Sequence, residues 1–167
     1  SIHVHAEQMH NGYDPIYDVL GCDPSHDGGE FVIPDNPFLI MERGPGGHAP
    51  YGEFNGTAAE YYSNHTEDEQ KMRDDYKTSI KLDATIFKQR VEYLQKEGVL
   101  DDTLVIYASD HGELLGEGGS IGHNSPMRPE LVYVPTVYIH PDLSTKEITE
   151  RSHHHVDITA TAFDVLG

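Results

Sequence analysis

Two short apolar runs separated by a long amphipathic segment constrain the fold of this chain most. Residues 37–42 (Pro-Phe-Leu-Ile-Met-Glu) form the first run, and residues 103–108 (Thr-Leu-Val-Ile-Tyr-Ala) form the second. Runs of this length that end at glycine or polar residues are typical of strands buried on both faces. A helix between two such strands predicts a right-handed parallel crossover. The pattern therefore indicates an α/β fold with a mostly parallel sheet flanked by helices.

The segment between the two runs predicts one long helix over about residues 67–97. Thr66 and Glu69 have the spacing of a capping box, and Gly98 supplies a stop. Apolar residues recur near helical spacing between these two signals. They are Tyr76, Ile80, Phe87, Val91 and Leu94.

The rest of the chain gives weaker signals. Residues 1–36 are rich in Gly, Pro, Asp and His, which predicts loops with one short strand at most. Residues 131–139 predict a third strand, interrupted by Pro135, and residues 155–166 predict a final short helix. No repeat or linker is evident. We therefore expect one domain over residues 1–167, irregular over 1–36 and α/β over 37–167.

The charge balance excludes some partners. Asp and Glu together number 29 against 11 Lys and Arg, which gives a formal net charge of -18. Such a charge repels nucleic-acid phosphates and anionic membrane surfaces, so we expect neither as a partner. It suits a protein that works in concentrated salt, where self-repulsion is screened. We interpret the chain as halophilic, with an ordinary acidic protein as the alternative.

Cysteine content and hydropathy limit the possible disulfides, zinc sites and membrane spans. Cys22 is the only cysteine, so neither an intrachain disulfide nor a cysteine-rich zinc site can form. There is no apolar run of 18 residues and no signal-like start, so we expect no membrane span and favour a cytoplasmic location. A segment upstream of Ser1 could still carry a signal.

Candidate site residues follow the two apolar runs. Asp110 and His111 come directly after the second run, where a carboxylate beside an imidazole can bind one divalent cation. The same tripeptide, Asp110-His111-Gly112, also suits a simple turn with a capping aspartate. His48 lies in the glycine-rich loop after the first run, and its alternative interpretation is an exposed loop histidine.

His123 lies at the far end of a second glycine-rich loop, which starts at Gly112. Its glycines allow close backbone approach to a ligand, and a histidine there could donate to an anionic oxygen. A flexible crossing without a ligand is the alternative. Because parallel strands place their C-terminal loops at one sheet edge, we expect His48, Asp110, His111 and His123 to converge on one site.

The order of these motifs resembles the sulfatase family of the alkaline-phosphatase superfamily. In that family a long helix, a Gly-x-Leu-Asp-x-Thr turn and a strand lead into an Asp-His-Gly or Asp-Asn-Gly loop whose first two residues bind the metal. The resemblance implies a partial alkaline-phosphatase-like fold, His48 in contact with a sulfate ester, and His123 where family members carry a Lys or His that touches the substrate anion. The similar segments are residues 44–51, 76–113, 133–139 and 156–164.

The family nucleophile is missing from the expected place. It is a formylglycine made from the Cys of Cys-x-Pro-Ser-Arg, after a strand that ends in two metal-binding aspartates. Cys22-Asp23-Pro24-Ser25-His26 has His in place of Arg and no such strand before it, so we do not assign Cys22 as the nucleophile. We expect this chain to be a C-terminal portion, inactive alone, with its remaining metal ligands and nucleophile in a missing N-terminal part.

The resemblance implies sulfuric ester hydrolysis with a divalent metal in the intact protein. Ca²⁺ is favoured, with Mn²⁺ or Mg²⁺ as alternatives, and the substrate would be a sulfate-ester small molecule or glycan. A phosphonate or phosphate monoester hydrolase of the same superfamily remains an alternative. A non-catalytic, truncated sulfatase-like module is another.

The net charge gives a first prediction. Raising KCl from millimolar to molar concentration should raise the melting temperature, because screening removes repulsion among the surface carboxylates. Thermal unfolding followed by circular dichroism checks this. A flat or falling melting temperature would argue against a halophilic protein.

Overall fold

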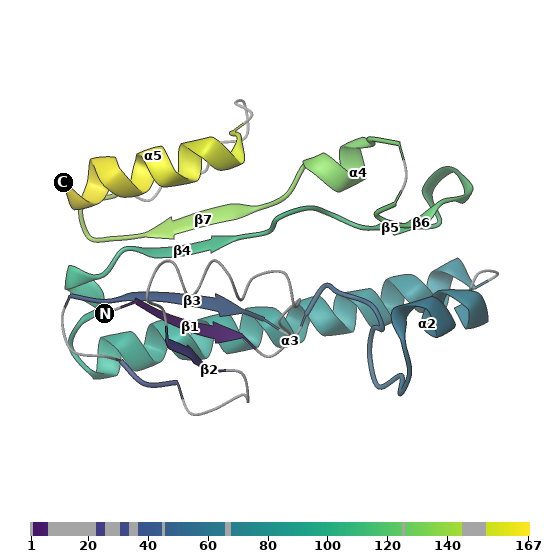
Figure 1. Ribbon diagram of the computed structural model, residues 1–167, viewed down its shortest axis with the longest axis horizontal. Helices are drawn as coiled ribbons and strands as arrows, with labels where there is room; N and C mark the ends of the chain where they lie inside the picture. Colours follow the sequence, from purple (N-terminus) through teal and green to yellow (C-terminus); the bar gives the residue numbers. More distant parts are fainter. Residues whose placement is uncertain are drawn as a thin grey trace.

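The computed structural model describes residues 2–6, 23–25, 31–33, 37–44, 46–65, 68–124, 126–144 and 153–167. Strands β1 (Ile2–Ala6), β2 (Asp23–Ser25) and β3 (Leu39–Arg43) form a parallel sheet in the order β2-β1-β3 (Figure 1). Ile2 of β1 lies opposite Leu39 of β3, and His3 lies opposite Asp23. The N-terminal part thus contributes two strands where the sequence predicts one at most.

The second half of the chain adds antiparallel pairs. Strand β4 (Val105–Ala108) pairs with β7 (Thr136–Ile139), with Val105 opposite Ile139. Strands β5 (Leu114–Leu115) and β6 (Ile121–Gly122) form a small hairpin around a 3₁₀ turn at Glu117–Gly119. In Figure 1, β3 and β4 run in the same direction, so the loops that follow them lie toward the same end of the molecule.

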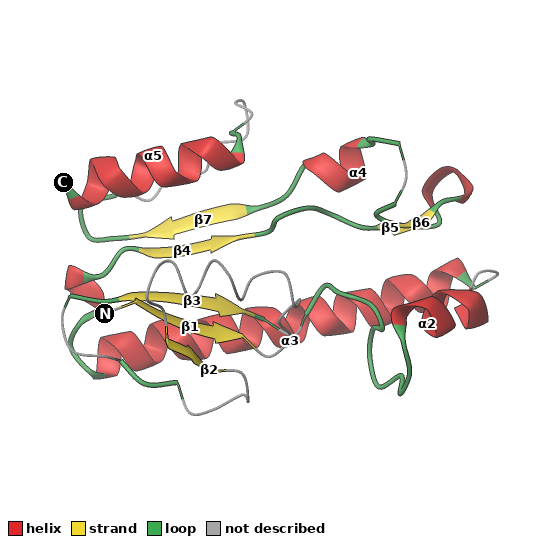
Figure 2. Ribbon diagram, viewed as in Figure 1, coloured by secondary structure: helices red, strands yellow, loops and turns green. Residues whose placement is uncertain are grey.

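The helices cover these strands from two sides (Figure 2). Helix α3 (Glu69–Lys96) runs along the parallel sheet, and α5 (His155–Leu166) lies beyond β7. Helix α2 (Ala58–His65) packs beside the start of α3, and the one-turn helix α4 (Pro129–Val132) precedes β7. A 3₁₀ turn at Leu100–Asp102 joins α3 to β4.

Helix α3 begins and ends on local hydrogen bonds. The Asp68 carboxylate accepts from the Lys71 N–H at 3.0 Å, so Asp68 is the N-cap, whereas the sequence predicts Thr66 in that role. Thr66 itself lies outside the described residues. At the other end Gly98 has φ +74°, and Val99 N–H donates to the Leu94 carbonyl at 3.1 Å. This left-handed turn is the stop that Gly98 predicts.

Helix α3 contacts both sets of strands. Its Arg90 makes a bidentate ion pair with Glu42 of β3, with N–O distances of 2.7–3.0 Å. Its Asp83 accepts from the Tyr107 hydroxyl of β4 at 2.9 Å, and its Phe87 ring lies 5.0 Å from the Tyr107 ring. Burial, followed by the Asp83 hydrogen bond, raises the pKa of Tyr107 to about 12, so this hydroxyl remains a donor at neutral pH. Helix α3 therefore fixes β3 and β4 relative to each other.

The core is aromatic and lies at the α2 end of α3. Tyr51 and Tyr61 are fully buried, with their rings edge to face at 5.2 Å. Tyr76 of α3 packs against Tyr51 in the same way at 5.3 Å. Edge-to-face pairs align the positive ring edge with the negative ring face, which adds to the free energy of burial. Met72 of α3 belongs to the same cluster, and its side chain is fully buried.

Two predictions from the sequence need correction, and a third is not confirmed. Residues 131–139 do not form one strand, because Pro129 starts the helical turn α4 and β7 begins only at Thr136, after Pro135. The single mostly parallel sheet is not confirmed, since the described strands form one parallel sheet and two antiparallel pairs. The prediction that the first run is buried on both faces is wrong, because Leu39 and Met41 of β3 are half exposed.

Helix α2 is absent from the sequence prediction although its signal is present. The Thr57 hydroxyl accepts from the Glu60 N–H at 3.2 Å, and the Glu60 carboxylate accepts from the Thr57 N–H at 2.7 Å. This is a reciprocal capping box with the spacing Thr-x-x-Glu. The predicted helices over 67–97 and 155–166 are confirmed as α3 and α5 within a few residues.

In the described part of the chain, every helix is too short or too polar to cross a bilayer.

The buried cluster predicts a contrast between two methionines. Met72→Ala should lower the free energy of unfolding by about 2–5 kcal/mol, because it leaves a cavity among the packed aromatic rings. Met127→Ala is the matched control, since its side chain is 84% exposed and its loss should change stability by less than about 0.5 kcal/mol. Urea denaturation measures both, and equal effects would contradict the assigned core.

Candidate functional site

The Asp110-His111 loop is held by its own hydrogen bonds. The His111 N–H donates to Asp110 Oδ1 at 2.9 Å, and the Ser109 hydroxyl donates to the His111 carbonyl at 2.7 Å. The Asp110 side chain is 81% exposed, and its Oδ2 lies 3.8 Å from His111 Nε2. A carboxylate and an imidazole nitrogen thus stand side by side directly after β4.

The His111 ring has a defined tautomer. Its Nδ1 lies 2.8 Å from the Gly112 carbonyl, which can only accept a hydrogen bond. Nδ1 therefore carries the proton, and in the neutral ring Nε2 keeps its lone pair. Backbone carbonyls hold metal-binding histidines in this way, with the other nitrogen toward the cation.

Gly112 is required by its close packing against α4. Its N–H donates to the Leu131 carbonyl at 2.9 Å, and a Cβ at this position would lie 1.9 Å from the Glu130 carbonyl oxygen. No side chain fits against this backbone of α4 without moving it. The first glycine of this loop thus approaches α4 closely, and approach of the loop to a ligand stays a prediction.

His123 comes next to His111 through the β5–β6 hairpin. The two rings have centroids 4.4 Å apart. His123 Nδ1 lies 3.1 Å from the Glu113 carboxylate, whose side chain is 3% exposed. Glu113 lies two residues beyond His111, just before strand β5 of the hairpin. The same short segment therefore carries His111 and the carboxylate that contacts His123.

His48 completes the group from the loop after β3. The loop is tied to α3, because Gly47 N–H donates to the Ser79 hydroxyl at 3.2 Å. His48 Nδ1 donates to the Ala49 carbonyl at 2.6 Å, so in the neutral ring Nε2 is the acceptor nitrogen. The His48 ring centroid lies 6.4 Å from that of His123.

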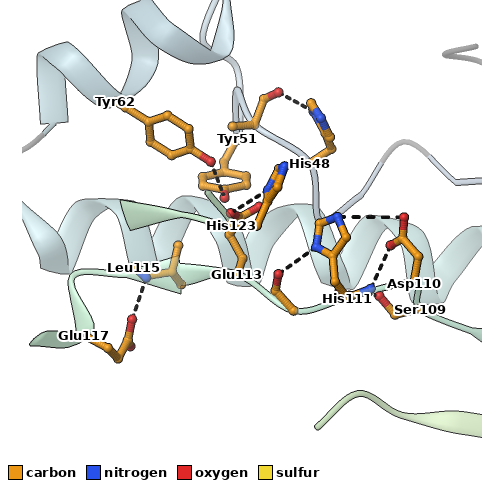
Figure 3. A network of polar contacts seen from close by, with 12 residues as sticks. His48, Tyr51, Tyr62, Ser109, Asp110, His111, Glu113, Leu115, Glu117 and His123 are labelled. Carbon is orange, nitrogen blue, oxygen red and sulfur yellow. Dashed lines mark hydrogen bonds and ion pairs between the residues drawn. The ribbon is translucent and has the colours of Figure 1, made fainter. Parts of the chain in front are cut away.

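The structure thus brings together the residues that the sequence predicts to converge (Figure 3). The side chains of His48, His111 and His123 are grouped, and Asp110 flanks His111. Their roles in metal binding and catalysis remain predictions. Cys22 lies outside the described residues.

Sequence reasoning misses the residues behind His123. The Tyr51 and Tyr62 hydroxyls lie 3.2 Å apart beside Glu113. Burial, then the hydrogen bond to Tyr62 and the charge of Glu113, raises the pKa of Tyr51 beyond its usual range. Burial also raises the pKa of Tyr62, to about 12, with a smaller contribution from Glu113. Glu113 directly follows Asp110-His111-Gly112, and that position is the signal that could have identified it.

The donor set suits a hard divalent cation only in part. Asp110 offers carboxylate oxygen, which Ca²⁺, Mn²⁺ and Mg²⁺ prefer, whereas the Nε2 that His111 offers is a ligand more typical of transition metals. Within the described ranges, no cluster of three or more His, Cys, Asp or Glu side chains has the geometry to hold a metal ion. Further ligands would have to come from elsewhere.

Comparison with known proteins identifies the family. Residues 30–167 match the sulfatase family, so the chain belongs to that family and its fold class is the alkaline-phosphatase-like α/β class. No solved structure matches the chain significantly.

Two curated relatives are similar to this chain. One is the low-salt glycan biosynthesis sulfotransferase Agl7 of Haloferax volcanii, 32% identical over 137 residues, which cover 78% of this chain and 34% of the relative. The other is an N-acetylglucosamine-6-O-sulfatase of Bacteroides thetaiotaomicron, 31% identical over 100 residues, which cover 59% of this chain and 18% of the relative. The chain thus spans about a third or less of the length of these relatives.

Proposed function

We propose that the intact protein is a metal-dependent sulfatase that hydrolyses a sulfate ester of a small molecule or glycan. The observation that carries the proposal is the grouping of His48, Asp110, His111 and His123 from three separate loops in a chain of the sulfatase family. A divalent cation, Ca²⁺ by preference, would act there as a Lewis acid on the ester oxygens.

Two residues of this chain would bind the cation and two would bind the ester. Asp110 and His111 would supply a carboxylate oxygen and an imidazole nitrogen to the cation. His48 and His123 would donate hydrogen bonds from Nε2 to the anionic ester oxygens when their rings are protonated. Both histidine rings would be oriented before substrate binds, because Nδ1 of each ring is already hydrogen-bonded to an oxygen of the protein.

The proposal needs parts of the protein beyond this chain. The nucleophile and further metal ligands would come from an N-terminal part, in keeping with the share of the curated relatives that this chain covers. In the intact protein we expect β3 and β4, which run in the same direction, to belong to one mostly parallel sheet. This chain alone would be inactive.

A second candidate is sulfuryl transfer to a sugar hydroxyl, which the name of the Haloferax relative favours. Hydrolysis and transfer share the anion site and the cation and differ in the acceptor, water or a hydroxyl group. Adding a glycan acceptor to the assay separates them, since transfer would yield a sulfated glycan in place of free sulfate.

The substrate class is tested with the intact protein and matched aryl esters. With 4-nitrophenyl sulfate we expect turnover that a chelator abolishes and Ca²⁺, Mn²⁺ or Mg²⁺ restores. With 4-nitrophenyl phosphate and phenylphosphonate esters we expect slower turnover. Faster turnover of the phosphorus esters would favour a phosphonate or phosphate hydrolase, and no turnover of any ester would favour a non-catalytic module.

The metal role of Asp110 gives a further prediction for the intact protein. Asp110→Ala should abolish turnover, because a methyl group cannot replace a carboxylate ligand. Asp101→Ala is the matched control, since Asp101 is an exposed aspartate in the turn before β4 and should leave turnover unchanged. Steady-state kinetics on both variants measures this, and retained activity in Asp110→Ala would rule out the metal assignment.

A further inference from the structure

Glu113 is the one charged side chain that is buried among the residues that the structure describes. Its side chain is 3% exposed, although the side chains of Asp110 and His111 just before it lie open to solvent. Burying a carboxylate costs free energy unless hydrogen-bond donors surround it. The proposed reaction gives Glu113 no part in binding the ester or the cation, so its burial needs another explanation.

The donors around Glu113 come from three elements. His123 directly follows strand β6, and its Nδ1 lies 3.1 Å from Oε1 of Glu113. The hydroxyl groups of Tyr51 and of Tyr62 in α2 lie beside the carboxylate and 3.2 Å from each other (Figure 3). Burial raises the pKa of both tyrosines, so both hydroxyls keep their protons at neutral pH. Glu113 thus connects the aromatic core to one histidine of the site.

The consequence concerns the two nitrogens of the His123 ring. A carboxylate accepts and cannot donate, so a hydrogen bond from Nδ1 requires the proton on Nδ1. Nε2 is then the nitrogen left for an external group, and rotation of the ring about its χ2 angle is restricted. A neighbouring carboxylate holds the catalytic histidine of serine proteases in this manner, and loss of that carboxylate leaves the wrong tautomer.

We propose that Glu113 is a positioning residue that holds the Nδ1–H of His123 and so orients the ring with its Nε2 toward the bound ester. The identity of the ester rests on the proposed function, whereas the hydrogen bond and the tautomer do not. Tyr51 and Tyr62 contribute by packing their hydroxyl groups beside the carboxylate.

The tautomer is measured by long-range ¹H–¹⁵N NMR of the histidine rings in the full chain. In the wild type we expect a protonated Nδ1 on His123. In Glu113→Gln, the side chain keeps its size but can donate through its amide group, so we expect His123 to lose the proton from Nδ1. The rings of His48 and His111 should keep theirs, because backbone carbonyls hold them.

Glu117→Gln is the matched control for this measurement. Glu117 lies in the same hairpin, is partly buried, and accepts from Leu115 N–H and Arg73 rather than from a histidine. Its substitution should leave the His123 spectrum unchanged. An unprotonated Nδ1 in the wild type, or a spectrum that Glu113→Gln does not alter, would overturn the proposal. The wild-type spectrum decides even if Glu113→Gln fails to fold.

Kinetics on the intact protein separates this inference from the proposed function. With 4-nitrophenyl sulfate, Glu113→Gln should lower kcat by about 10- to 100-fold with KM less affected, and Glu113→Asp should restore part of the loss. A lost tautomer together with unchanged kcat would overturn the link between positioning and catalysis. If the wild type turns over no ester while the NMR result holds, the proposed function fails and the positioning role of Glu113 stands.

Discussion

The packing of α3 against β3 and β4 is the constraint on which the rest of the structure depends. Arg90 holds β3 through Glu42, and Asp83 holds β4 through Tyr107. Because the two strands run in the same direction along one helix, the loops after them open toward the same end of the molecule. The loops that carry His48 and Asp110 therefore lie toward the same end although their strands do not pair with each other.

The aromatic core lies next to these loops and gives them a rigid support. Tyr51 is three residues beyond His48, and its buried ring packs against rings from α2 and α3. Its hydroxyl lies beside the Glu113 carboxylate, to which His123 also donates. The same residues that exclude water from the core thus limit how far the histidines can move, which is the condition for donors that need no rearrangement on binding.

The sequence predicts the elements with strong local signals. The helix stop at Gly98, the strand before Asp110 and the last helix follow from chemistry within a few residues of each. Strand pairing is not local, so the antiparallel partner of β4 and the strand β1 are missed. Glu113 is missed for the same reason, since its burial depends on tyrosines about 50–60 residues earlier in the chain. The grouped histidines could be predicted because each one follows a strand or a glycine-rich loop.

The contact of Gly112 with α4 limits where this part of the chain can change in length. The backbone at Gly112 lies against the Glu130 carbonyl, which leaves no space for an added atom, whereas the space around Gly119 at the tip of the hairpin is open. Insertions, whether natural or engineered, should therefore be tolerated at the tip and not at its base. Homologues could then differ in how far the hairpin extends while Asp110 and His123 keep their positions in space.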